Sequence, residues 1–157
     1  MISRATVLAV GRLRGWSAEG ADDYLKRLRR YFPVEVVEVR EADMNQLSPE
    51  EVLFREAELL LARVPNGAHV VALDRERGRE HSSEELAARL AALGTSGKSH
   101  VAFVIGGALG LAPQVLSRSD EAWSLGAPTL PHALARVVLL EQVYRAVKIG
   151  RGEKYHW

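Results

Sequence analysis

Short apolar runs rich in β-branched residues alternate along this chain with longer stretches of helical periodicity. The strand-like runs cover residues 6–10, 34–39, 69–73 and 101–105, with a weaker fifth run over 121–125. Helices are predicted over 18–31, 49–64, 83–93, a short segment after Pro113, and 133–149. This alternation is typical of a mostly parallel sheet with helices on both faces. No linker, repeat or low-complexity segment interrupts it, so we predict a single α/β domain over residues 1–157.

Two helix starts carry a complete capping signature. A proline stands directly after Ser48, and Glu51 lies three residues after the serine, as in a capping box opened by proline. Ser82 and Glu85 repeat the box at the start of the next predicted helix. Gly94 follows the last apolar residue of that helix, and we predict that it ends the helix.

Composition narrows the classes of function and location. The 157 residues include 21 Lys and Arg against 20 Asp and Glu, so no strong overall field draws the protein onto nucleic acid or a membrane. The absence of cysteine excludes disulfides, thiolate metal sites and a cysteine nucleophile. No run of about 20 apolar residues could cross a bilayer, and the first apolar run is too short for a signal peptide. We therefore expect a soluble cytoplasmic protein.

Ligands of such sheets bind beyond the carboxyl ends of the strands, which points to Leu73-Asp74, Gly106-Gly107 and residues 125–130. Two segments there carry further signals. The first is a glycine-rich turn, with Gly106, Gly107 and Gly110, directly after the run 101–105. It matches neither a Walker A loop nor the dinucleotide fingerprint, so it is either a plain turn or a place where a ligand approaches the backbone. The second, residues 123–132, is apolar with two prolines, and we predict that it is buried. Its backbone groups would then pair with an adenine ring or with protein alone.

The C-terminal part of the chain raises further expectations. The predicted helix 133–149 is apolar on more than one stripe, which indicates central burial or an oligomer interface. Glu141 and Arg145 lie one turn apart on it, and we favour an ion pair between them over a catalytic role. The tail 150–157 ends in Tyr155, His156 and Trp157, and these rings favour docking over fraying.

Positive charge gathers near the N-terminus and after the run 69–73, at Arg12, Arg14, Lys26, Arg27, Arg29, Arg30, Arg75, Arg77 and Arg79. These side chains could neutralise RNA phosphates. Acidic residues lie near them in the sequence, however, and we favour solvated surfaces.

Five motifs, taken together, carry a resemblance to a known family. They are Val-Ile-Gly-Gly-x-x-Gly-Leu (104–111), Trp-Ser-Leu (123–125), Thr-Leu-Pro-His (129–132), Arg-Val-Val-Leu-Leu-Glu-Gln-Val-Tyr-Arg-Ala (136–146) and Arg-Gly-Glu-x-Tyr-His (151–156). Residues 8–11 and 70–74 fit the same pattern. The combination closely resembles the RlmH family, SPOUT-class methyltransferases specific for a pseudouridine of large-subunit (23S) ribosomal RNA.

The resemblance implies an α/β fold with a C-terminal trefoil knot, a homodimer, and S-adenosyl-L-methionine as cofactor. It implies a cofactor wall made of Leu73, Gly106, Leu125, Gly126, Ala127, Pro128, Thr129 and Leu130. The implied reaction is methylation of N3 of a pseudouridine, within the ribosome and without a metal.

A base would assist this reaction, because N3 of pseudouridine carries a proton. The other requirement of methyl transfer is alignment of the reacting atoms. His156 and Tyr155 are the candidates for the catalytic role, and His132, Glu141 and Arg145 are weaker ones.

Two positions depart from the family pattern: Leu109, where a polar residue is common, and Trp157, where we expect a polar or basic one. Two alternative functions remain open. One is a SPOUT methyltransferase acting on transfer RNA, and the other is a non-catalytic RNA-binding dimer of the same fold.

Overall fold

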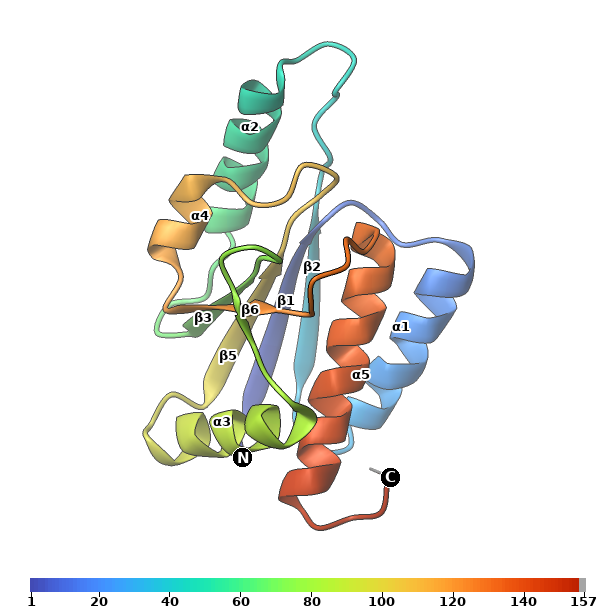
Figure 1. Cartoon of the computed structure of the whole chain (residues 1–157), viewed down its shortest axis with the longest axis vertical. Helices are drawn as coiled ribbons and strands as arrows, with labels where there is room; N and C mark the ends of the chain where they lie inside the picture. The colour runs from blue at the N-terminus through green and yellow to red at the C-terminus, as the bar shows by residue number, and fades with distance from the viewer. Residues whose placement is uncertain (156–157) are drawn as a thin grey trace.

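The computed structural model describes residues 1–155, within which six strands form one sheet whose neighbouring strands are all parallel (Figure 1). The strands are β1 (Arg4–Val10), β2 (Val34–Val39), β3 (His69–Leu73), β4 (Arg79–Glu80), β5 (His100–Ile105) and β6 (Glu121–Ser124). Their order across the sheet is β2-β1-β5-β3-β6-β4. The helices are α1 (Gly15–Leu28), α2 (Pro49–Leu61), α3 (Ser83–Thr95), α4 (Pro113–Arg118) and α5 (His132–Gly150).

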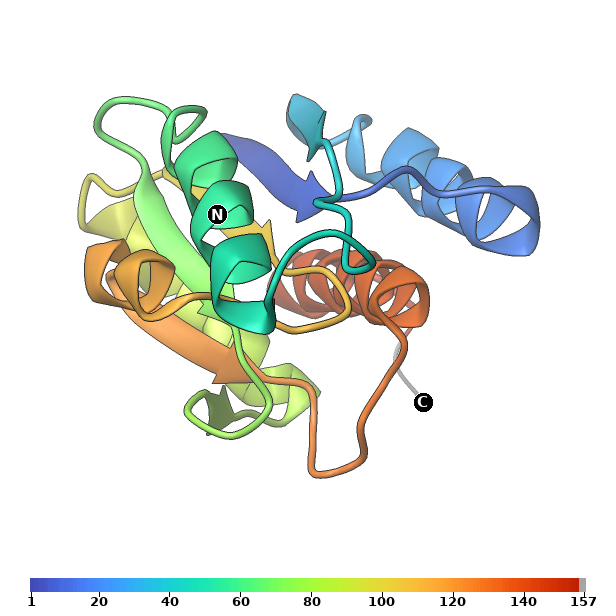
Figure 2. The same ribbon diagram turned by 90° about the horizontal axis from the view of Figure 1, so that it is seen from above.

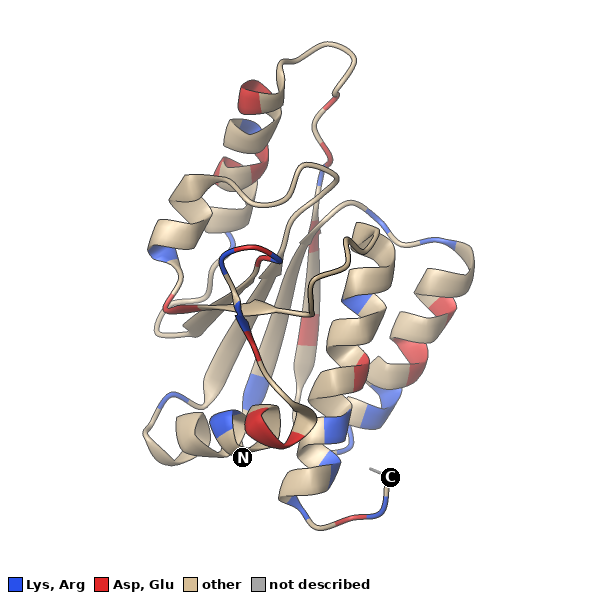
Figure 3. Ribbon diagram, viewed as in Figure 1, with Lys and Arg blue, Asp and Glu red and all other residues tan. Residues whose placement is uncertain are grey.

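Both faces of the sheet are buried, which confirms the predicted fold class. Successive side chains of a strand point to opposite faces. Val7 and Ala9 of β1 therefore lie in a core shared with α1, α3 and α5, while Leu8 and Val10 lie in a second core shared with α2 and α4. Charges of both signs are interspersed over the elements in Figure 3, in keeping with the net charge of +1. Within the described residues, no helix has both the length and the apolar character needed to cross a membrane.

α5 lies between α1 and α3 and packs against both (Figure 1). Leu139, Leu140, Val143 and Val147 are all buried, so more than one stripe of this helix faces protein. Among the described residues, α5 contributes none of the large apolar side chains that are exposed. Central burial within the chain therefore accounts for most of its apolar excess.

Several boundaries differ from the prediction. α1 begins at Gly15 rather than residue 18, because its start has no side-chain cap that could have marked it. α1 and α2 end before residues 31 and 64, where turns follow. The prediction that Gly94 ends α3 was wrong, because the helix continues to Thr95. A Cβ at Gly94 would lie 2.3 Å from the Met1 carbonyl oxygen, so this glycine allows the backbone of Met1 to pack closely against α3. The chain turns instead at Gly97, whose φ is +80°. β4 was not predicted, because two residues show no periodicity.

The loop after β3 crosses the end of β6 with backbone against backbone. A Cβ at Gly78 would lie 2.3 Å from the carbonyl carbon of Trp123 and 2.5 Å from the Ser124 nitrogen, so only glycine fits. The Asp74 N–H donates to the Trp123 carbonyl (2.9 Å), and the Ser124 hydroxyl donates to the Arg75 carbonyl (2.9 Å). This crossing joins two loops that follow neighbouring strands of the sheet.

Candidate functional site at the carboxyl edge of the sheet

The predicted cofactor wall lies on three strands that are neighbours in the sheet. Leu73 ends β3, Gly106 follows β5, and Leu125 follows β6. These strands stand side by side in the order β5-β3-β6, and because they are parallel the three positions share one edge. Gly106 is buried, whereas Leu73 and Leu125 are half-buried. The fold thus brings together residues that are far apart in the sequence.

The loop 125–131 connects β6 to α5 and extends away from the rest of the chain in Figure 2. Ala127, Pro128 and Thr129 are exposed, so the prediction of a buried stretch was wrong for its centre. Burial is confined to Trp123 and Ser124, where β6 still pairs with β3 and β4. Leu125, Gly126 and Leu130 are half-buried, and the tip at 127–129 is accessible to another molecule.

Hydrogen bonds hold the base of this loop and leave its tip with free donors. Ser124 Oγ accepts from the Gly126 N–H (3.2 Å), and Arg75 Nη1 donates to the Ala127 carbonyl (3.0 Å). In the described part of the chain, the N–H groups of Ala127, Thr129 and Leu130 have no acceptor. Such donors, next to apolar side chains, can bind the polar edge and the flat face of a heterocyclic base.

The glycine-rich turn after β5 has a structural requirement for glycine that the sequence did not reveal. A Cβ at Gly106 would lie 2.2 Å from the Gly110 carbonyl oxygen, and the Gly110 N–H donates to the Gly107 carbonyl (3.1 Å). Gly106 is therefore needed to close the turn on itself, independently of any ligand. Leu109, at the tip of this turn, is 39% exposed and offers no polar group to a ligand.

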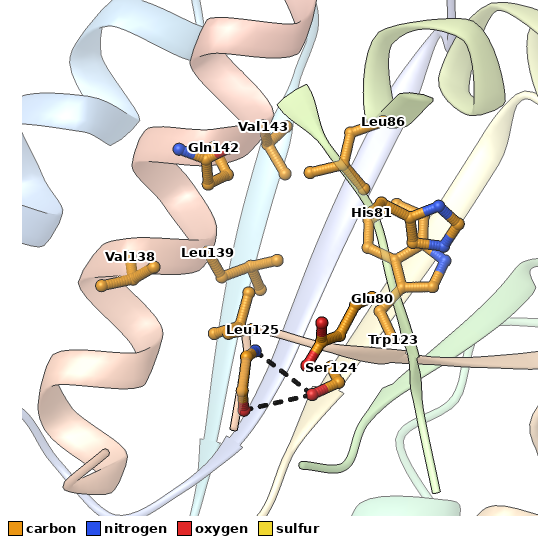
Figure 4. Close-up of a pocket in the computed structure, with 11 residues that line it drawn as sticks. Glu80, His81, Leu86, Trp123, Ser124, Leu125, Val138, Leu139, Gln142 and Val143 are labelled. Carbon is orange, nitrogen blue, oxygen red and sulfur yellow. Dashed lines mark hydrogen bonds between the residues drawn. The ribbon is translucent and has the colours of Figure 1, made fainter. Parts of the chain in front are cut away.

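A cavity of about 250 Å³ lies behind the loop 125–131, between β6, α5 and the loop that leads into α3 (Figure 4). Its polar lining residues are Glu80, His81, Ser124 and Gln142, and its apolar ones are Leu86, Trp123, Leu125, Val138, Leu139 and Val143, with Gly126 completing the wall. Only Leu125 and Gly126 belong to the predicted cofactor wall as well. The volume is slightly below the range of about 300–1,000 Å³ that small-molecule sites span, so this cavity has room for part of a cofactor.

His81 and Gln142 line this cavity but were not predicted from the sequence. Burial, and then the nearby Arg79, lower the pKa of His81 below its ordinary value, which favours the neutral ring. Its ring meets the Trp123 ring edge-on, with 5.6 Å between the centroids. No motif distinguishes these residues in the sequence. The β3–α3 loop, which crosses β6, places His81 at the cavity, and α5 places Gln142 there.

The described part of the tail, through Tyr155, docks onto α5 of the same chain. The Tyr155 hydroxyl donates to Glu141 Oε2 (3.1 Å), its ring meets the Tyr144 ring edge-on with centroids 4.9 Å apart, and the Arg145 guanidinium lies 4.8 Å from its centroid. Burial, and then a hydrogen bond with Tyr24, raise the pKa of Tyr155. Its phenol is therefore protonated at neutral pH and cannot serve as a base.

Glu153 anchors the tail two residues before Tyr155. Its Oε2 accepts from the Tyr31 hydroxyl (2.6 Å) and from Lys148 Nζ (2.5 Å), and its Oε1 accepts from Arg151 Nε (2.8 Å). The hydrogen bonds from Lys148, Tyr31 and Arg151 lower the pKa of Glu153 to about 2. The anchor is therefore charged throughout the neutral range.

The remaining catalytic candidates lie in different places. Glu141 and Arg145 form the predicted ion pair (3.1 Å). His132 is the first residue of α5, and its Nδ1 is buried without a partner among the described residues. His156 and Trp157 lie outside the described residues. In the part of the chain that is described, no group of three or more His, Asp or Glu residues is placed to hold a metal ion.

Comparison with known proteins identifies the family. The model of one family, described as "Predicted SPOUT methyltransferase", matches residues 3–156. The chain belongs to the SPOUT methyltransferase family. A relative from Rubrobacter xylanophilus, named ribosomal RNA large subunit methyltransferase H, is 71% identical over 158 residues that cover all of both chains. A relative of the same name from Pelotomaculum thermopropionicum is 48% identical and covers 97% of this chain and 98% of its own.

A solved structure has a similar fold at greater sequence distance. A probable methyltransferase from Bordetella pertussis Tohama I aligns with a TM-score of 0.55 at 17% identity, over 92% of this chain and 96% of its own. The family model and the two relatives confirm the expected family, and with it the assignment of this chain as a methyltransferase.

Proposed function

We propose that this SPOUT methyltransferase transfers a methyl group from S-adenosylmethionine to N3 of a pseudouridine in 23S ribosomal RNA. The proposal is carried by the match to relatives named ribosomal RNA large subunit methyltransferase H, which reaches 71% identity over the full length of both chains. The assembly of the three predicted loops at one sheet edge adds support from this chain's own geometry. The whole chain, residues 1–157, would act as one domain, and it would act where ribosomes are, in the cytoplasm.

The residues present fit the proposed cofactor. The free N–H groups of Ala127, Thr129 and Leu130 suit the edge of an adenine ring, and Leu73 and Leu125 offer apolar contact to its face. Gly106, Gly126 and Pro128 would shape the remaining wall. When bound, S-adenosylmethionine supplies an activated methyl group. The adjoining 250 Å³ cavity would accommodate part of the cofactor or of the target nucleotide.

The protein itself would contribute two things to the reaction: it would align the target base with the methyl group, and it would accept the proton that leaves N3. Attack by N3 requires that its proton leave, and a neutral imidazole is suited to accept it. Because the Tyr155 phenol stays protonated, we assign the role of base to His156 and that of positioning to Tyr155. Arg145, which pairs with Glu141, lies over the Tyr155 ring and would help to hold it in position.

Two further parts of the proposal concern the knot within the chain and the pairing of two chains. The crossing of the β3–α3 loop over β6 at Gly78 supports the trefoil knot that the family resemblance implies. Leu134 and Val138 of α5 are half-buried in the single chain, and the exposed apolar loop 125–131 precedes this helix. We propose that a second copy covers this surface in a two-fold homodimer.

The experiment that tests the function measures methyl transfer to three substrates. Labelled S-adenosylmethionine is incubated with the protein and with ribosomes, stripped 23S ribosomal RNA or transfer RNA from cells that lack this modification. We expect labelled product only from the ribosomal substrates, with mass spectrometry placing the methyl group on a pseudouridine. Transfer to transfer RNA alone would contradict the proposed substrate. Cofactor or RNA binding without transfer to any of the three would identify a non-catalytic binding protein.

A further inference from the structure

A short basic and aromatic segment stands exposed between β1 and α1. Trp16 is 64% exposed, the largest exposed fraction among the large hydrophobic side chains described. Arg12 and Arg14 are exposed beside it, and the segment between β1 and α1 is partly blue in Figure 3. We refer to Arg12, Arg14 and Trp16 as the basic–aromatic segment.

Contacts within the chain occupy other arginine side chains of this region, but not those of Arg12 and Arg14. Arg27 pairs with Asp23 (3.0 Å), and Arg29 donates to the Val34 carbonyl. Within the described chain, by contrast, neither Arg12 nor Arg14 has a side-chain hydrogen bond or an ion pair. Their guanidinium groups are therefore available to an external anion, unlike those on the following turns of the helix.

The backbone of the segment is held rigidly. The Gly11 N–H donates to the Val39 carbonyl (2.9 Å), and the Gly11 carbonyl accepts from Nη2 of the buried Arg136 (2.9 Å). The Leu13 N–H donates to Glu38 Oε2 (3.2 Å). A fixed backbone lowers the entropic cost of binding a partner.

The same contacts connect the segment to the candidate site. Arg136 lies in the second turn of α5, shortly after the loop 125–131, and it bonds directly to Gly11. The segment and the candidate cofactor loops therefore border the same carboxyl edge of the sheet. Arg12 and Arg14 lie two residues apart in the segment that enters α1, and Arg14 has an extended backbone (φ −141°, ψ 158°). The first turn of α1 contains no acidic residue that would cancel their charge.

We propose that the basic–aromatic segment binds a single-stranded stretch of the substrate RNA, with a nucleobase stacked on Trp16 and phosphates on Arg12 and Arg14. This inference rests on the proposed function, which makes RNA the substrate. An exposed indole gives any base a flat surface for stacking, and unpaired arginines neutralise phosphates without reading sequence. The segment would orient the RNA strand whose target base enters the site.

The test measures RNA binding by fluorescence anisotropy with a labelled oligouridine and with a labelled RNA duplex. We expect Trp16→Ala to weaken oligouridine binding about tenfold, and Trp16→Phe to retain most of it. The double variant Arg12→Gln/Arg14→Gln should reduce the slope of log affinity against log salt by about 1.4, since each contact to a single strand contributes about 0.7. The duplex should be affected less by the loss of Trp16, because its bases are already stacked.

Two matched controls share the chemistry of the segment but lie elsewhere. Arg30→Gln removes an exposed arginine beyond the opposite end of α1, and Phe54→Ala removes an exposed ring from α2. Both should bind oligouridine as the parent does. With methyl transfer as a second readout, Trp16→Ala should raise KM for the ribosomal substrate and leave both kcat and the affinity for S-adenosylmethionine unchanged.

Three outcomes would overturn the proposal. Parental oligouridine affinity in Trp16→Ala would remove the stacking role. A smaller molecular mass of the Trp16→Ala variant than of the parent in light scattering would assign the segment to a contact between copies of the chain. Parental methylation of ribosomal RNA with an unchanged KM in all segment variants would refute this inference and leave the proposed function standing. Conversely, segment-dependent RNA binding without any methylation would refute the proposed function alone.

Discussion

Replacing Glu121 by glutamine should destabilise the fold strongly, because this carboxylate joins β6, β3 and α3. Its oxygens accept hydrogen bonds from Arg89 Nη2 (2.5 Å) and Trp123 Nε1 (2.6 Å), and Oε2 lies 2.6 Å from His69 Nε2. The Glu121 side chain is 18% exposed and that of His69 is 4% exposed. Removing the negative charge would leave the half-exposed Arg89 and the buried His69 facing a neutral amide.

The pKa of Glu121 sets the size of this effect. Burial alone would raise the pKa, but the hydrogen bonds from Arg89, Trp123 and His69 outweigh burial and lower it from 4.5 to about 2. Each pKa unit corresponds to about 1.4 kcal/mol, so the charged form stabilises the folded state by about 3 kcal/mol. Because the Arg89 side chain is 40% exposed, solvent screening reduces the expected loss to about 2 kcal/mol.

Urea unfolding at fixed protein concentration, followed by circular dichroism, measures this loss. At pH 7 we expect the free energy of unfolding of Glu121→Gln to lie about 2 kcal/mol below that of the parent. A carboxylate with a lowered pKa stabilises the fold above its unfolded pKa and loses that contribution as the pH falls through its folded pKa. The difference between parent and variant should therefore shrink as the pH falls from about 5 towards 2.

Glu76→Gln serves as the control for this comparison. The Glu76 side chain is 73% exposed in its pair with Arg75, so its replacement should change the free energy of unfolding by less than about 0.5 kcal/mol. A loss below about 1 kcal/mol for Glu121→Gln at pH 7, or a difference that stays constant down to pH 3, would refute the reasoning.

Three further predictions concern the crossing, the tail and assembly. Gly78→Ala should prevent folding or lower the melting temperature severely, because the methyl group would overlap the Trp123 backbone. In the control Gly97→Ala, the new methyl group meets open space at φ +80°, and the free energy of unfolding should fall by only about 1 kcal/mol. Equal melting curves for the two variants would contradict this. Deleting residues 155–157 should strongly lower methyl transfer and leave the affinity for S-adenosylmethionine, measured by calorimetry, nearly intact; loss of cofactor affinity would instead make the tail part of the pocket. Light scattering at micromolar concentration should show a dimer, and a monomer would exclude a site shared between two copies.

The order of strands and helices could be predicted from the sequence because its signals are local. The short apolar run of β1 and the capping boxes at Ser48 and Ser82 each act within a few residues, and the structure confirms the elements they predict. The start of α1 lacks such a cap, and there the prediction failed. The rule that ligands bind beyond strand ends pointed to the loops after β3, β5 and β6. The structure places these loops at one edge, because parallel strands carry their carboxyl ends to a common edge, and a ligand site there stays a prediction.

Contacts between distant parts of the chain could not be predicted in this way. Gly94 packs against the backbone of Met1, and Gly78 packs against that of Trp123. In the sequence both are isolated glycines, for which a helix end or a turn is the usual explanation. The exposed tip of the loop 125–131 was missed for a related reason: apolar composition indicates that a segment will be covered, but it does not say whether the cover is the same chain, a ligand or a second copy.

Gly106 shows how the two kinds of information combine at the site. From the sequence, a glycine after a buried strand suggests that a ligand approaches the backbone, and Gly106→Val would then be a test of cofactor binding. In the structure, a side chain at this position would collide with the Gly110 carbonyl, so the same substitution would deform the turn whether or not a cofactor binds there. A cleaner test is Thr129→Pro, which removes one free N–H at the exposed tip, where no element of the described chain packs. Weakened binding of S-adenosylmethionine in that variant, with unchanged unfolding, would separate the role of this loop in recognition from its role in the fold.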